Sequence, residues 1–172
     1  MSKTAVFFGP QGGSVHKVAQ MAASELGSDI KMVSIQGTQA SELLNYERII
    51  MGISTVGRAN WDSSHQDSGW DAFLTQMQNM NLAGKRVAIF GLGDALTYPE
   101  NFVDAMAILY DRCKELGATI DGECLPDGYQ FTDSTALRNG KFIGLPIDED
   151  NEPELTTPRL QAWIKGLKAL GY

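Results

Sequence analysis

The chain has 172 residues, 43% of them apolar, and it carries 14 lysines and arginines against 21 aspartates and glutamates, a formal net charge of −7. This length and apolar content predict one globular domain over residues 1–172, with a sizeable core. Nucleic acid is not expected as a partner, because its phosphates would meet net repulsion and the chain has no basic stripe to offset it. The acidic charge instead favours protein partners with basic docking surfaces.

The apolar runs of the sequence are only as long as strands, so we expect no insertion into a membrane. The first residues lack the basic segment and apolar stretch of a secretory signal, and we expect a cytoplasmic protein. The two cysteines, Cys113 and Cys124, have neither metal-site nor redox-motif spacing, which predicts reduced thiols and no metal site. We expect a monomer.

Strand and helix patterns alternate along the chain. Apolar runs predict strands over residues 4–8, 30–35, 48–53, 86–90 and 141–147. Apolar residues at helical spacing predict helices over residues 15–26, 70–77, 102–116 and 160–167, with Pro99 in the first turn of the third. This alternation predicts a doubly wound α/β fold, a three-layer sandwich around a five-stranded parallel sheet.

In such folds ligands bind beyond the carboxyl ends of the strands. The loops over residues 9–14, 54–68 and 91–101 begin at those ends. The first of these loops holds Gly12 and Gly13 at the start of a helix. Backbone N–H groups there can converge on a phosphate with help from the helix dipole, although a tight connection that binds nothing is the alternative. The glycine spacing fits neither a dinucleotide fingerprint nor a triphosphate loop, which leaves a single terminal phosphate as the best match.

Two aromatic residues lie in the other loops, Trp61 in the second and Tyr98 in the third. Together they can sandwich a planar ring, each contact contributing on the order of 1 kcal/mol beyond burial. A flat heterocycle bearing one phosphate fits these loops. No residue pattern indicates a nucleophile or a general acid, and His16 and His65 are assigned to the surface, so any catalysis belongs to the cofactor.

Two longer segments carry a family resemblance. Residues 91–102 read GLGDALTYPENF, and residues 127–150 contain DGYQFTDS followed by ALRNGKFIGL and DED. These segments resemble the flavodoxins, and specifically their long-chain branch, over nearly the whole chain. The second segment is similar to the insertion that splits the fifth strand in long-chain members, so the resemblance implies a split fifth strand here.

The resemblance implies one non-covalent FMN and low-potential, one-electron transfer between a reductase and an acceptor protein, with no enzymatic activity. Tyr98 matches the aromatic that stacks on the outer face of the flavin ring. Thr55, next to Ser54, matches a hydroxyl residue near the ribityl chain and phosphate. Other positions match the polar edge of the ring, namely Leu92, Gly93, Asp94 and Asn101. An acidic run near the cofactor end matches Asp148, Glu149 and Asp150, for which a solvated face is the alternative.

The phosphate loop departs from the family pattern Thr-x-Thr-Gly-x-Thr. At these positions the chain has Pro10, Gln11, Gly12, Gly13, Ser14 and Val15, so all three threonine hydroxyls are missing, and Pro10 also lacks an N–H. Hydrogen bonds to a charged group contribute roughly 1.5–3 kcal/mol each. We therefore predict that backbone N–H groups of residues 11–15 and the Ser14 hydroxyl hold the phosphate, with help from the long middle loop.

The middle loop is about five residues longer than the family pattern. Val56 stands where many flavodoxins place the tryptophan of the inner flavin face. Either Trp61 takes over that contact or Val56 alone packs on the ring. Arg58 can reach the phosphate or lie solvated. The Gly57–Arg58 peptide matches the family's peptide beside flavin N5, whose carbonyl turns on reduction, and glycine permits the turn.

Two alternatives rank below the electron carrier. The first is an FMN-dependent NAD(P)H:quinone-type reductase, in which the long loop with Arg58 and Trp61 roofs a substrate pocket. It would oxidise NAD(P)H without a partner protein. The second is a binding module that has lost FMN, motivated by the altered phosphate loop, and it would fail to bind added FMN.

Overall fold

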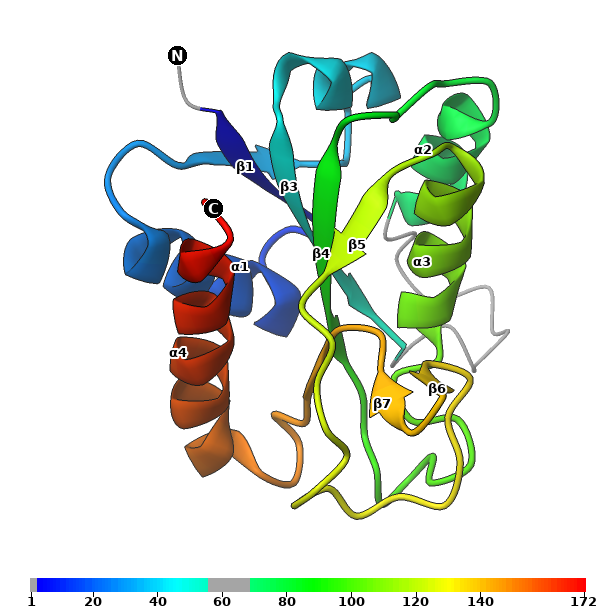
Figure 1. Ribbon diagram of the computed structural model, residues 1–172. Coiled ribbons are helices and arrows are strands. Elements are labelled where there is room, and N and C mark those ends of the chain that lie inside the picture. The colour runs from blue at the N-terminus through cyan, green and yellow to red at the C-terminus, as the bar shows by residue number, and fades with distance from the viewer. Residues whose placement is uncertain (1–2, 56–68) are drawn as a thin grey trace.

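Helices cover both faces of a parallel sheet in residues 3–55 and 69–172, the part of the chain that the computed structural model describes (Figure 1). The strands of this sheet are β1 (Thr4–Phe8), β2 (Lys31–Ser34), β3 (Arg48–Ser54), β4 (Arg86–Leu92), β5 (Thr119–Asp121) and β8 (Leu145–Ile147). Helices α1 (Ser14–Leu26) and α4 (Pro153–Ala169) pack on one face, and α2 (Trp70–Met77) and α3 (Ala105–Glu115) pack on the other. A short 3₁₀ helix, η1 (Ala40–Asn45), precedes β3.

The order of the strands reverses beside β1. The sheet runs β2-β1-β3-β4-β5, with every pair parallel, so the chain moves outward in one direction after β1 and in the other direction from β3 onward. In a doubly wound sheet this reversal opens a crevice at the carboxyl ends of the two central strands. The loop after β1 lies at that edge of the sheet, as does Thr55, which follows β3. The prediction of a doubly wound α/β sandwich is confirmed.

The fifth position of the sheet is shared by two short strands. Strand β5 pairs with residues 86–88 of β4, and β8 pairs with residues 90–92 of the same strand. The residues between them leave the sheet and form an antiparallel hairpin of β6 (Leu137–Arg138) and β7 (Lys141–Phe142). The split fifth strand implied by the resemblance is therefore present.

The predicted strand over residues 141–147 is wrong in its extent. Lys141–Phe142 belongs to the hairpin, and only Leu145–Ile147 joins the sheet. Gly144 joins the two, and a Cβ at this position would lie 2.1 Å from the Ile89 carbonyl oxygen. The chain thus turns into the sheet against the backbone of β4, where only glycine fits. The three residues of β5 were too few to be recognised from their pattern.

The third helix begins later than predicted, at Ala105 rather than near Phe102, so Pro99 lies in the preceding turn. Contacts with the insertion hold the backbone before Ala105. The Phe102 N–H donates to the Asp133 carbonyl at 3.3 Å, and the Ser134 hydroxyl donates to the Phe102 carbonyl. Val103 then has φ 49°, outside the helical region.

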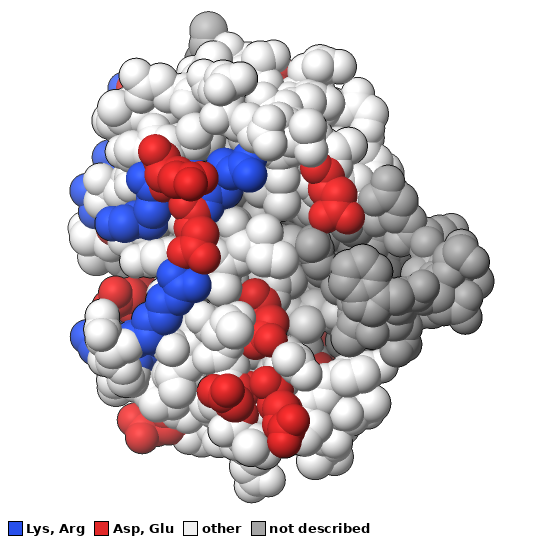
Figure 2. All heavy atoms as spheres, turned by 90° about the vertical axis from the view of Figure 1, so that its right-hand side faces the viewer, with Lys and Arg blue, Asp and Glu red and all other residues white. Residues whose placement is uncertain are grey.

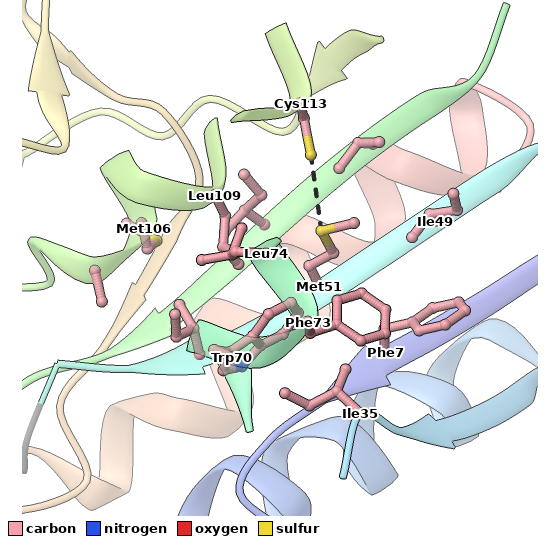
Figure 3. Close-up of a cluster of buried hydrophobic side chains, with 14 of the residues drawn as sticks. Phe7, Ile35, Ile49, Met51, Trp70, Phe73, Leu74, Met106, Leu109 and Cys113 are labelled. Carbon is pink, nitrogen blue, oxygen red and sulfur yellow. Dashed lines mark hydrogen bonds between the residues drawn. The ribbon is translucent and has the colours of Figure 1, made fainter. Parts of the chain in front are cut away.

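The two faces of the sheet are covered by separate apolar clusters, because neighbouring strand residues point to opposite faces. Figure 3 shows the cluster under α2 and α3, in which Phe7, Phe73 and Trp70 pack against Met51 and Leu109. The fully buried Trp70 indole N–H lies between the Gly9 and Gly52 carbonyls, at 3.3 and 3.2 Å. This contact ties α2 to the carboxyl ends of β1 and β3, and Trp70 is a core residue.

Candidate functional site

The loops after β1, β4 and β8 lie at the carboxyl edge of the sheet, at the bottom of Figure 1, together with Thr55 after β3. Backbone hydrogen bonds continue beyond the strand ends and hold these loops side by side. Gly9 N–H donates to the Gly52 carbonyl at 3.3 Å, Thr55 N–H to the Leu92 carbonyl at 2.9 Å, and Gly93 N–H to the Ile147 carbonyl at 2.9 Å. The loops that the sequence singled out around residues 9–14, 54–55 and 91–101 therefore share one edge with the acidic residues after β8.

The loop between β1 and α1 presents an open helix end. Gln11, Gly12, Gly13 and Ser14 are all exposed, and a Cβ built at Gly12 or Gly13 meets nothing within 4 Å. Gly12 has φ 90°, which favours glycine. The first helical bond is donated by Lys17 N–H to the Gly13 carbonyl, and no side chain caps the helix.

The N–H groups of residues 13–16 have no acceptor among the described residues, as expected for the first turn of a helix that no side chain caps. An anion can satisfy them, and the helix dipole favours negative charge there. Only the backbone of Val15 can contribute, because its side chain is buried in the core between the sheet and α1.

Two N–H groups of the predicted phosphate loop already have acceptors. Gln11 N–H donates to Gln36 Oε1 at 3.2 Å, and Gly12 N–H donates to His16 Nδ1 at 3.0 Å. The His16 ring also stacks on Phe8, with centroids 4.6 Å apart and planes at 24°. His16 therefore lies half-buried in the first turn of α1, where its ring borders the loop between β1 and α1. Its position four residues after Gly12, one helical turn away, was the signal in the sequence.

The loop after β4 is organised by Asp94. Its Oδ1 accepts bonds from Thr97 N–H and Asn151 Nδ2, both at 2.9 Å, and its carbonyl accepts from Tyr98 N–H at 2.9 Å. Burial raises the pKa of the Asp94 carboxyl, but the bonds from Asn151 and Thr97 outweigh burial and leave that pKa lowered. Asp94 thus positions the half-buried Tyr98 at the edge of the sheet.

The other candidates in this loop offer less than predicted. Leu92 is buried in the core on the α1 side, so only its backbone faces the loop. The Gly93 N–H is taken by the Ile147 carbonyl, and a Cβ at Gly93 would lie 2.9 Å from the Phe102 ring. The Asn101 amide donates to the Asp104 carboxylate at 3.1 Å. These residues shape the loop, and Tyr98 is its candidate ring contact.

At the end of β3, Ser54 is half-buried and Thr55 is buried. The Thr55 hydroxyl oxygen accepts the Ala105 N–H at 3.0 Å and so caps the start of α3. Its hydroxyl hydrogen remains a possible donor. Four further candidates, Val56, Gly57, Arg58 and Trp61, lie outside the described residues, and their roles stay predictions.

The three acidic residues after β8 differ in their contacts. Asp148 is buried and accepts bonds from Ala95 N–H and from the backbone and side chain of Asn151, at 2.8–3.1 Å. Glu149 accepts from Lys17 Nζ at 2.8 Å and from the Thr156 hydroxyl at 2.6 Å. Two of the three carboxylates are therefore structural.

Asp150 is exposed and has no such bond among the described residues. Desolvation, followed by the charges of Asp94, Asp148 and Glu149, raises the pKa of its carboxyl. Of the three carboxylates in this run, that of Asp150 is therefore the one not engaged in a structural hydrogen bond within the described residues.

Figure 2 shows the face of the molecule over α2 and α3. Basic side chains lie among acidic ones on part of this face. In its lowest part, toward the carboxyl ends of the strands, the charged residues in view are acidic. Within the described residues, no helix has the length and apolar character needed to span a membrane, and no three His, Cys, Asp or Glu side chains cluster closely enough to hold a metal ion.

The fold defines a doubly wound α/β protein with an open, uncapped helix start, that of α1, at the carboxyl end of β1 beside the reversal of strand order. The family model described as Flavodoxin matches residues 6–163, so the chain belongs to the flavodoxin family.

Relatives and solved structures agree with this placement. The chain is 36% identical over 172 residues to a flavodoxin of Synechocystis sp., covering 99% of this chain and 98% of that protein. It is 38% identical over 170 residues to a flavodoxin of Picosynechococcus sp., covering 98% and 97%. The crystal structure of Fusobacterium nucleatum flavodoxin bound to flavin mononucleotide matches with a TM-score of 0.87 at 26% identity, covering 99% of both chains.

Proposed function

We propose that this chain carries one non-covalently bound FMN and passes single electrons between protein redox partners. The observation that carries the proposal is the open, glycine-bearing start of α1 beside the Tyr98 loop, in a member of the flavodoxin family. A related flavodoxin from Fusobacterium nucleatum is bound to flavin mononucleotide, which supports the same cofactor here.

The residues present fit this cofactor. The N–H groups of Gly13, Ser14 and Val15 and the Ser14 hydroxyl would hold the phosphate, because they are exposed or lack an acceptor in the described structure. Tyr98 would stack on the ring. Ser54 and Thr55 would face the ribityl chain, and the loop over residues 92–101 would border the polar edge of the ring.

Bound FMN supplies the acceptance and release of electrons one at a time. The protein supplies position, exclusion of water and charge. Asp94, Asp148 and Asp150 place negative charge at this edge of the sheet. A carboxylate about 10 Å from an added negative charge raises its energy by about 1–2 kcal/mol at an effective dielectric constant of about 20. These carboxylates therefore favour a low redox potential.

The partners in this proposal are a reductase and an acceptor with basic docking surfaces. The net charge of −7 and the acidic side chains near the carboxyl ends of the strands support it, since opposite charge speeds encounter. A cytoplasmic location is supported by the cysteines, Cys113 and Cys124, which are both free thiols. The reductase alternative is not favoured, because flavodoxins are electron carriers rather than enzymes.

A visible spectrum of the freshly purified protein tests the proposal. We expect the absorption bands of oxidised flavin and one FMN per chain after extraction. With a flavodoxin reductase and NADPH the bands should bleach, whereas NADPH alone should leave them unchanged. A colourless protein that fails to bind added FMN would contradict the proposal, and steady NADPH oxidation without a partner would favour the enzyme.

A further inference from the structure

His16 lies over the loop that joins β1 to α1. Its Nδ1 accepts the Gly12 N–H at 3.0 Å, and its ring stacks on Phe8 at 4.6 Å. These two contacts, one polar and one aromatic, fix the imidazole beside the open start of α1. The nitrogen occupies a position at which an external acceptor for the Gly12 N–H would also have to lie.

The contact with Gly12 depends on the protonation state of the ring. A neutral imidazole has one nitrogen that accepts a hydrogen bond, whereas an imidazolium has two donors and no acceptor. Protonation at Nδ1 therefore breaks the observed bond. The same event frees the Gly12 N–H and places a positively charged donor next to it.

We propose that His16 is a phosphate-site residue that couples cofactor binding to the uptake of one proton. This inference rests on the proposed binding of FMN. When the phosphate occupies the start of α1, Nδ1 takes a proton from solvent and donates it in a hydrogen bond to a phosphate oxygen, and Gly12 N–H turns to the phosphate as well. The phosphate thereby gains one backbone donor, from Gly12, and one charged donor, from His16.

The sheet beside the His16 ring carries no charge at the positions next to Phe8. Phe8 of β1 packs on the His16 ring. Phe8 pairs with Ser34 on β2 and with Gly52 on β3, and all three residues are uncharged. Lys17, the next residue along α1, pairs with Glu149 at 2.8 Å. Thr156 of α4 donates to the same carboxylate.

Burial raises the pKa of Glu149, but the bonds from Lys17 and Thr156 outweigh burial and leave that pKa lowered, so the Glu149 carboxylate stays ionised near neutral pH. Histidine is the side chain that ordinarily changes charge between pH 5 and 8.

The test compares the unaltered protein with His16→Gln, whose amide oxygen can still accept the Gly12 N–H but cannot gain a proton. FMN and riboflavin dissociation constants are measured from pH 5.5 to 8.5 at constant ionic strength. The FMN phosphate itself titrates at about pH 6, and the ratio of the two proteins' constants cancels that effect. We expect the variant to bind FMN about tenfold more weakly at pH 5.5 and about equally at pH 8.5. For riboflavin the ratio should stay near one throughout.

A matched control removes a neighbouring positive charge. Lys17→Gln should weaken FMN binding by the same factor at every pH. In the unaltered protein, NMR titration of the imidazole should show a higher pKa for His16 with FMN bound than without, and no such change with riboflavin. This second measurement requires no variant.

An FMN affinity ratio that does not vary with pH, or an imidazole pKa unaffected by FMN, would overturn the role of His16 while leaving FMN binding intact. Failure of the unaltered protein to bind FMN would overturn both the role of His16 and the proposed function.

Discussion

At the scale of single residues, the start of α1 shows how an anion site can be built with few side chains. Ser14 has the one hydroxyl in the loop over residues 9–14, and it is exposed at the first position of the helix. Backbone N–H groups do not depend on side-chain identity, so the loss of the threonines removes only part of the donors. The remaining side-chain donor should then be measurable by itself.

Replacing Ser14 by Ala should weaken FMN binding by about tenfold or more, because a hydrogen bond to a charged group contributes roughly 1.5–3 kcal/mol. Riboflavin, which lacks the phosphate, should lose much less. Fluorescence titration of both ligands measures the difference. Ser14→Thr, which keeps the hydroxyl, is the matched control. Equal losses for the two ligands would place Ser14 away from the phosphate.

A second residue-scale prediction contrasts two glycines. A Cβ at Gly52 would lie 2.1 Å from the Phe90 ring in the sheet, whereas a Cβ at Gly166 in α4 meets nothing within 4 Å. Gly52→Ala should destabilise the protein by about 1–3 kcal/mol through overpacking. Gly166→Ala should stabilise it by about 0.5–1 kcal/mol through helix propensity. Urea unfolding midpoints measure both, and a Gly52→Ala protein as stable as its parent would argue against this close approach.

At the scale of elements, side-chain contacts hold the segments around the site. The Arg159 guanidinium of α4 lies 4.0 Å above the Tyr129 ring and donates to the Gly128 carbonyl at 3.0 Å, which ties the insertion to α4. Lys17 of α1 pairs with Glu149, just before α4. The second contact links the N-terminal end of α1 to the acidic run after β8.

The Glu149 contact predicts a pH-dependent stability. Because the pKa of Glu149 is lowered on folding, its contribution is present above the ordinary glutamate pKa of 4.5 and is lost as pH falls through the lowered folded-state value. Glu149→Gln should therefore be less stable than the parent at pH 6–7, and the difference should shrink toward pH 3. Urea midpoints across this range provide the measurement. A difference that does not change with pH would mean that the charge of Glu149 has no role.

At the scale of the whole molecule, net charge and shape govern encounter with partners. The acidic side chains toward the carboxyl ends of the strands and the net charge of −7 predict attraction to basic proteins. The expectation of a monomer stays a prediction.

Electron transfer with a basic partner should slow as ionic strength rises from about 0.01 to 0.5 M, since the screening length falls from about 30 Å to only a few Å. Stopped-flow measurement of flavin bleaching gives the rate. An acidic redox protein as the partner is the control, and its rate should rise with salt. A rate that is insensitive to salt would contradict electrostatic docking.

Local sequence determined the alternation of strands and helices and the loops that form the site, because apolar periodicity and glycine turns are properties of neighbouring residues. The helix at Trp70–Met77 and the strand at Thr4–Phe8 follow their patterns. The segments around Tyr98 and residues 127–150 also carried the family resemblance. Tertiary structure decided what depends on distant partners. Hydrogen bonds from the insertion delay the start of α3, close contact at Gly144 ends the hairpin, and Gly12 and Phe8 together hold His16 over the phosphate loop. None of these contacts produces a periodic pattern in the sequence. The hydrogen-bond partner of each polar group is therefore decided only when distant segments come together in the folded chain.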